Sequence, residues 1–242
     1  MILKLLFGAV FLAVIALSPS FVKAQRNGPT KKSLAIKMAA ATGYLAVGAL
    51  AAAISNNYSH FALLIGIALL LCWIGDLFLH LTGSRIFFGV GFLAFFSAHF
   101  VFIAAYLLVI KSAAPDRPLF SLPEIIAVVL FDVFFLVFSK LIGTEFKGWL
   151  KVPIVLYGTV IVFMLCKAAV MGVSLIQANA PCAVISACIA VCGAALFVAS
   201  DFSIAVLIFN QKYKKSYPLK MFNIVTYFLA VLLLASLLLF VR

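Results

Sequence analysis

The feature that most constrains this chain is a series of apolar runs, each long enough to cross a membrane as a helix. Crossing the hydrocarbon core takes about 20 residues of helix. Such runs occupy residues 2–22, 34–54, 60–81, 86–110, 121–141, 152–175, 181–209 and 219–241. Apolar residues make up 67% of the 242 and charged residues 10%, which excludes a soluble domain of useful size. The sequence predicts an all-α integral membrane protein, with residues 1–242 forming a single domain built as an eight-transmembrane-helix bundle.

The basic residues, which give the chain a formal net charge of +12, lie in short connections between the apolar runs. They form no extended patch, so we do not expect a nucleic-acid partner. The connections after the first, third, fifth and seventh runs carry Lys23, Arg26, Lys31, Lys32, Arg85, Lys140, Lys147, Lys151, Lys212, Lys214, Lys215 and Lys220. Lys and Arg accumulate in cytoplasmic loops. We therefore expect these four loops in the cytoplasm and both termini on the other side of a bacterial inner membrane, or of the endoplasmic reticulum in a eukaryote.

The first run also fits a second interpretation. Lys4, the apolar stretch after it and the sequence VKAQ at 22–25 would satisfy a signal peptide cleaved after Ala24. Cleavage would place the basic segment QRNGPTKKS outside the cell, against the charge pattern of the other loops. We therefore favour a membrane span for residues 2–22.

All five cysteines lie in apolar runs and lack the spacing of a zinc site: they are Cys72, Cys166, Cys182, Cys188 and Cys192. We interpret them as packing residues and expect neither a disulfide framework nor a metal.

Three carboxylates lie inside the apolar runs, at a similar depth. Counted from the basic ends at 1.5 Å per residue, Asp76, Asp201 and Asp132 lie about 14, 15 and 12 Å deep, and His99 lies close to the bilayer centre. A charge in hydrocarbon costs about 2.5–3.5 kcal/mol on insertion scales, so each of these residues requires an explanation. We expect Asp76 and Asp201 to converge on one water-poor pocket, where one carboxyl group holds a proton and the other is ionised, as in an acid/base pair.

Structural roles are the alternative for each polar residue. An intramembrane Asp can simply bond a neighbouring helix, and Asp132 fits this role as well as a catalytic one. His99 could equally be a satisfied core imidazole. Lys167 is expected to snorkel to the interface, and Lys37 to be a topology charge or a partner for a lipid phosphate. The glycines at 75, 89, 91 and 193 are expected at close helix contacts. The tyrosines at 106, 157, 213, 217 and 227 are expected as interfacial anchors or as hydroxyl groups of the pocket, and the sequence alone does not sort them.

Three segments in order resemble the motifs of a known family of membrane proteins. They are IGDLFL (74–79), GVGFLAFFSAHFVFIAAY (89–106) and GAALFVASDFSIA (193–205). In motif order, separation and number of spans the chain resembles the YhhN, or lysoplasmalogenase, family from about Lys37 to the last span. The resemblance implies a hydrolase with no known cofactor, which cleaves the vinyl ether bond of lysoplasmalogens to a fatty aldehyde and a glycerophospho-base. Asp76, His99 and Asp201 match the three motifs, and Lys37 matches a basic residue in the second span.

Two departures from the family pattern concern the site. In the last span the family often carries Tyr-x-x-Ala-Gln, whereas this chain keeps Tyr227 and Ala230 and has Val231 in place of Gln. Asp132 matches none of the motifs. A substrate contact through that Gln is therefore not expected here.

Vinyl ether hydrolysis suits two buried carboxylates, because its difficult step is protonation of the β-carbon. An anion stabilises the resulting oxocarbenium ion, and a base activates the water that captures it. We expect Asp76 and Asp201 to supply the acid and the base, in either order, with His99 orienting a carboxylate or the water. Lys37, Tyr227 and Arg85 are the candidate substrate-binding residues, with Lys37 or Arg85 near the phosphate of a lysophospholipid.

Other functions are compatible with the same residues. Intramembrane Asp and His also mark the ion pathways of proton-coupled or solute transporters, although the chain shows no inverted repeat. A hydrolase acting on another lysolipid would need the same carboxylates. Aldehyde release, solute uptake and a substrate panel separate these possibilities.

Overall fold

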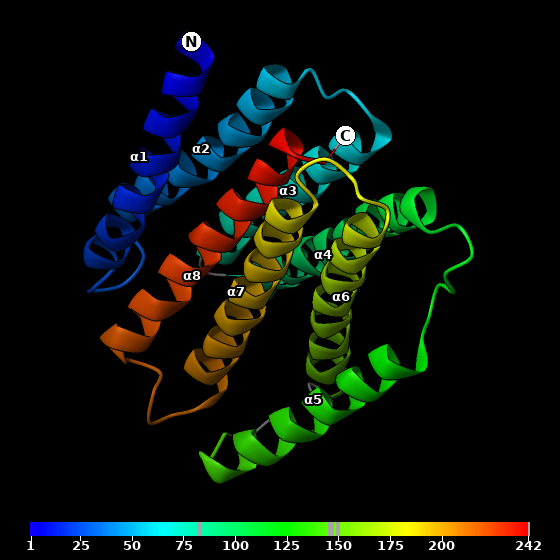
Figure 1. The fold of residues 1–242 in the computed structure, drawn as a ribbon. Coiled ribbons are helices and arrows are strands. Elements are labelled where there is room, and N and C mark those ends of the chain that lie inside the picture. Colours follow the sequence, from blue (N-terminus) through cyan, green and yellow to red (C-terminus); the bar gives the residue numbers. More distant parts are fainter. Residues whose placement is uncertain (82–83, 145–147, 149–150, 242) are drawn as a thin grey trace.

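The computed structural model describes residues 1–81, 84–144, 148 and 151–241 and has eight long helices within them (Figure 1). Each helix is long and apolar enough to cross a membrane. The helices are α1 (Ile2–Ala24), α2 (Lys31–Ser55), α3 (His60–His80), α4 (Arg85–Ala113), α5 (Leu122–Leu141), α6 (Lys151–Gln177), α7 (Ala183–Phe209) and α8 (Tyr217–Ser236). The predicted fold class is confirmed: the described part of the chain is a helical membrane protein without strands.

The helix ends follow local capping signals. Thr30 and Ser33 form a capping box that starts α2, three residues before the expected position, and Ser216 caps α8 ahead of a proline in its first turn. The end of α8 differs most from expectation, because the helix stops at Ser236 and a 3-10 turn over Leu237–Leu239 follows. Lys147, one of the predicted topology charges, lies outside the described residues.

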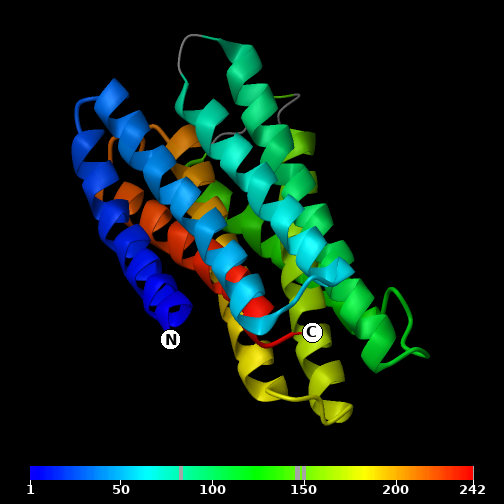
Figure 2. The ribbon, with the colours of Figure 1, turned by 90° about the horizontal axis from the view of Figure 1, so that it is seen from above.

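Helix α8 occupies the middle of the bundle and packs against α1, α2, α3 and α7. The other neighbouring pairs are α1–α2, α2–α3, α3–α4, α4–α6 and α6–α7, while α5 lies at the edge against α6 (Figure 1). Seen from above, both termini lie at one end of the bundle, and the α1–α2 and α7–α8 connections lie at the other (Figure 2). The positively charged connections after α1 and α7 are therefore neighbours in space.

Helix α1 lies against α2 and α8 and buries Phe21 and Val22. A Cβ atom on Gly43 of α2 would lie 2.4 Å from a methyl group of Val14, so these two helices approach closely at this point. Cleavage after Ala24, the alternative considered from the sequence, would remove all of these contacts.

Three of the four glycines expected at close contacts lie at such contacts. A Cβ atom on Gly75 would lie 2.5 Å from the ring of Phe95, one on Gly91 2.7 Å from Leu79, and one on Gly193 2.8 Å from Leu234. Gly89 has no atom within 4 Å of that position, so the expectation for it was wrong. Gly75 directly precedes Asp76, and its missing side chain lets α4 approach α3 beside the carboxylate.

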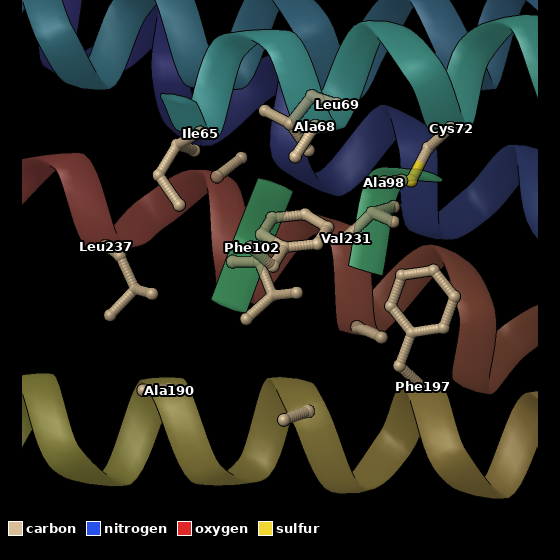
Figure 3. Close-up of a cluster of buried hydrophobic side chains, with 14 of the residues drawn as sticks. Ile65, Ala68, Leu69, Cys72, Ala98, Phe102, Ala190, Phe197, Val231 and Leu237 are labelled. Atoms are coloured by element: carbon tan, nitrogen blue, oxygen red, sulfur yellow. The ribbon is translucent and has the colours of Figure 1, made fainter. Parts of the chain in front are cut away.

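An apolar core fills the space between α3, α4, α7 and α8 (Figure 3). On α3 the core runs from Ile65 through Leu69 to Cys72, opposite Phe102 and Phe197. Asp76 follows Cys72 by one turn of α3 and is equally buried. The polar groups of the site therefore begin where this apolar core ends.

Candidate active site

Asp76 of α3 is 1% exposed and has three side-chain partners. Lys37 of α2 places its Nζ atom 3.0 Å from Asp76 Oδ1 and also donates to the backbone oxygen of Asp76 at 2.9 Å. Tyr227 of α8 and Tyr44 of α2 donate their hydroxyl groups to Asp76 Oδ2 at 2.7 and 3.2 Å. An ammonium group and two hydroxyl donors thus compensate the desolvation of this carboxylate. We call these four residues the Asp76 cluster.

The Asp76 cluster depends on the spacing along α2. Lys37 and Tyr44 are seven residues apart, which is about two turns of helix, so both face α3. The Nζ atom of Lys37 lies over the ring of Phe21, 5.9 Å from the ring centre. Lys37 therefore pairs with a buried carboxylate, and it is neither an exposed topology charge nor free to bind a phosphate by itself.

Asp201 of α7 has a different set of partners. Tyr157 of α6 donates its hydroxyl group to Asp201 Oδ2 at 2.5 Å. His99 of α4 places its Nε2 atom 3.0 Å from the Tyr157 oxygen and 3.4 Å from Asp201 Oδ2. The His99 side chain is fully buried, whereas that of Asp201 is 14% exposed. Three helices therefore join in a second polar centre, the Asp201 cluster.

Hydrogen positions in the Asp201 cluster follow from its geometry. The Tyr157 hydroxyl donates to Asp201, so its oxygen is free to accept a proton donated by His99 Nε2. A neutral His99 would then carry no proton on Nδ1, which is buried and has no hydrogen-bond partner in the described chain. The chain His99, Tyr157, Asp201 is thus a continuous path along which a proton can move.

Aromatic rings separate the two clusters. The ring of Tyr227 lies 5.6 Å from those of Phe95 and Phe197, and Phe197 lies 4.8 Å from the ring of His99. Within the described residues, Asp76 and Asp201 are not bonded to each other. Because Phe197 contacts Tyr227 of one cluster and His99 of the other, the two clusters are nonetheless neighbours in the core. The expected direct pair of carboxylates is therefore revised to two neighbouring centres with aromatic residues between them.

The remaining predicted residues lie apart from both clusters. Asp132 accepts a hydrogen bond from Thr159 of α6 at 2.8 Å. It thus bonds a neighbouring helix, which was the structural role considered for it from the sequence. Arg85 is exposed at the first residue of α4. Lys167 is 1% exposed and lies 2.7 Å from Glu124 Oε1, so the expectation that it snorkels to the surface was wrong. Its positive charge is paired inside the bundle.

Sequence reasoning missed Tyr44 and left Tyr157 unassigned. The seven-residue spacing from Lys37 could have indicated Tyr44, since both are polar residues on one face of an apolar helix. Tyr157 offered no comparable signal, because its role arises from the packing of α6 against α4 and α7. Val231, in place of the family's Gln, is fully buried among apolar residues one turn beyond Tyr227, where it adds no polar group to the site.

Metal binding needs several His, Cys, Asp or Glu side chains that point to one place. The described residues contain no group of three or more such side chains placed to hold a metal ion.

The helices and the two clusters define a class of protein: a multi-pass integral membrane protein with carboxylates buried inside the bundle. The chain belongs to the YhhN family, whose model matches residues 32–238, from the start of α2 to the end of α8. In the comparisons with curated proteins and with solved structures, nothing matches this chain. The three motifs that carried the resemblance thus lie within the matched segment.

Proposed function

We propose that the protein is a lysoplasmalogenase: a membrane hydrolase that cleaves the vinyl ether bond of a lysoplasmalogen to a fatty aldehyde and a glycerophospho-base. Family membership supports a hydrolase of this type. The observation that carries the proposal is the pair of buried carboxylates in unlike surroundings, Asp76 against an ammonium group and Asp201 at the end of a tyrosine–histidine path. Two carboxyl groups in different environments are suited to different roles in one reaction.

Asp201 is the better candidate for the general acid. It has no Lys or Arg partner in the described chain, and its side chain is the more exposed of the two carboxylates. A proton passes from the Asp201 carboxyl group to the β-carbon of the vinyl ether, which becomes an oxocarbenium ion. Tyr157 then donates to the newly ionised Asp201, in the arrangement that the hydrogen bonds describe.

Water completes the reaction without a net change in protons. It adds to the oxocarbenium carbon and loses one proton, which His99 accepts on Nδ1 while its Nε2 proton moves through Tyr157 to Asp201. Before the next turnover His99 gives its Nδ1 proton to solvent and takes one from solvent on Nε2, which restores the starting tautomer. The product is a hemiacetal, which collapses as its hydroxyl proton moves to the departing glycerol oxygen. Asp76, paired with Lys37, contributes a fixed negative charge that stabilises the cationic intermediate.

Purified protein incubated with a lysoplasmalogen should release free aldehyde. Asp201→Asn should lower the rate by a factor of about 10²–10⁴, because the proton donor is lost. Asp76→Asn should also lose activity, with a loss of stability as well, because it leaves the Lys37 ammonium group buried without its partner. A reaction run in D₂O should place one deuterium on the aldehyde carbon next to the carbonyl.

Asp132→Asn is the matched control. Asp132 is also an intramembrane carboxylate, but its partner is the neutral hydroxyl group of Thr159. We expect it to retain close to the wild-type rate. Full activity of a folded Asp201→Asn protein would remove Asp201 from the mechanism, and absence of aldehyde from the wild type would reject the proposed reaction. Solute uptake by proteoliposomes in that case would favour a transporter.

A further inference from the structure

Positive charge gathers at the end of the bundle where α2 and α8 begin. Lys37 of α2 and Lys220 of α8 each lie seven residues, about two turns, before a tyrosine that donates to Asp76, so both face α3. His80 lies one turn beyond Asp76 on α3, toward the same end of the bundle. Lys220 is half-buried, so it does not simply extend into water. Like charges brought together in a partly buried place destabilise one another unless an anion is present.

Arg26 extends this group from the connection between α1 and α2. Its guanidinium carbon lies 5.9 Å from the ring centre of Tyr217, the first residue of α8. In the described chain, neither Arg26 nor Lys220 is paired with a carboxylate, and the one carboxylate paired with Lys37 is Asp76. We call Arg26, Lys37, His80 and Lys220 the basic cluster; the positive charges of Arg26 and Lys220 in it are not compensated by a carboxylate of the described chain.

Two helix starts add to the attraction for an anion. Helices α2 and α8 both begin at this end, so the positive ends of their dipoles lie beside the basic cluster. His80 is held in place by Ser33, whose hydroxyl oxygen lies 3.1 Å from His80 Nε2. Lysine side chains, a histidine and helix N-termini are the groups that bind phosphate in proteins.

The basic cluster is in register with the candidate active site. His80 follows Asp76 by four residues on α3, which is about 6 Å along the helix axis. A phosphate group beside His80 and Lys220 would leave the glycerol and the vinyl ether to reach one turn deeper, to the level of Asp76. The headgroup and the reacting bond of one lysolipid would thus lie at successive turns of α3.

We propose that the basic cluster binds the phosphate group of the substrate, with Lys220 as its principal ligand and Arg26 as a second one. The identity of the lipid in this proposal rests on the proposed function. The binding of a phosphate group rests on the charge of the basic cluster. The proposal assigns to Lys220 the role that the sequence had suggested for Lys37 or Arg85. Lys37 instead links the phosphate site to Asp76.

Binding of a lipid that cannot be cleaved tests this proposal. The probe is a 1-O-alkyl lysophosphocholine with a saturated ether, titrated by calorimetry into purified protein in non-ionic detergent. Lys220→Gln should weaken its binding about fivefold, the loss expected for one lysine–phosphate contact. Binding of the uncharged 1-O-alkylglycerol should not change. Lys215→Gln, which removes the same charge from an exposed position in the α7–α8 connection, is the matched control and should bind both lipids like the wild type.

Inorganic phosphate distinguishes the two sources of the anion. If inorganic phosphate competes with the lysolipid for the wild type but not for Lys220→Gln, the site binds phosphate itself. If inorganic phosphate competes for neither protein, the site binds phosphate only when a lipid carries it. Equal binding of the lysolipid by the wild type and Lys220→Gln would overturn the proposal, as would equal weakening of both lipids by that variant. The ether probe cannot react, so its binding is independent of hydrolysis. If the probe binds in a Lys220-dependent way and no aldehyde is released from a lysoplasmalogen, the proposed hydrolase is rejected and the phosphate site is retained.

Discussion

Among single residues, Tyr157 links the acid to its source of protons. Tyr157→Phe removes the hydroxyl group that joins Asp201 to His99 but keeps the ring, which packs 5.0 Å from Phe92 and 6.0 Å from Phe96. We expect a folded protein whose kcat falls by about 10²-fold, because Asp201 can no longer regain its proton along this path. Steady-state aldehyde release at saturating lysoplasmalogen measures the change.

Tyr106→Phe controls for the loss of a buried hydroxyl group. Tyr106 is fully buried, and its hydroxyl group has no partner in the described part of the chain. Removing an unpaired buried hydroxyl group costs nothing and can stabilise a protein, so rate and thermal stability should match or exceed those of the wild type. A Tyr157→Phe protein as active as Tyr106→Phe would show that Asp201 regains its proton by another route.

The sequence identified the chemically active residues better than it identified their partners. An Asp or His in an apolar span is conspicuous because of what its burial costs, so Asp76, His99 and Asp201 stood out at once. A tyrosine in such a span is ordinary, and Tyr44 and Tyr157 gained their roles only when neighbouring helices brought them to a carboxylate. Lys37 was interpreted as a topology charge or a ligand for a lipid phosphate, because its position along α2 does not reveal which residue of α3 it faces.

Among the helices, α5 is held by an ion pair in addition to its apolar contacts. Lys167 of α6 lies 2.7 Å from Glu124 and donates to the backbone oxygen of Leu119, just before α5 begins. Glu124 also accepts hydrogen bonds from the backbone and hydroxyl groups of Ser121, forming the capping box of α5. One carboxylate therefore both starts this helix and attaches it to α6.

Glu124→Gln separates these two contributions, because glutamine can still complete a capping box. The variant leaves the buried ammonium group of Lys167 without its counter-charge, a change that costs about 3–5 kcal/mol. We expect a clear fall in the thermal unfolding midpoint in detergent. A double variant, Glu124→Leu with Lys167→Met, should recover part of the loss, since an apolar pair leaves no charge buried. An unchanged midpoint in Glu124→Gln would show that the ion pair contributes nothing.

Helix positions could be predicted because length and apolarity decide them, and the helices differ from the predicted spans by a few residues at most ends. Which helices are neighbours could not be predicted, because lipid-facing and core-facing residues are equally apolar in a membrane protein. The central place of α8 and the edge position of α5 follow from side-chain fit, such as that of Leu234 against Gly193. The distance between Asp76 and Asp201 depends on this packing, which explains why equal depth did not make them a pair.

For the whole molecule, the orientation in the membrane decides from which leaflet the substrate comes. The charge pattern predicts that the basic loops are cytoplasmic. Both termini lie at the opposite end of the bundle (Figure 2). Cys182, exposed at the start of α7, lies in the α6–α7 connection at the same end as the termini. We therefore expect a membrane-impermeant maleimide to label Cys182 on intact spheroplasts of a bacterial host.

Two variants complete the orientation test. Cys182→Ser should abolish labelling. Cys72 is buried, and Cys166, Cys188 and Cys192 lie within the apolar spans α6 and α7, which a membrane-impermeant reagent does not enter, although the last two are exposed on the bundle. Lys214→Cys in that background, in the α7–α8 connection, should be labelled only after the membrane is permeabilised. The opposite pattern would contradict the charge rule for this chain and move the basic cluster to the outer surface. Lys220 would then meet lipids of the other leaflet, and a lysoplasmalogen supplied from the cytoplasmic side would have to cross the bilayer before its phosphate could bind.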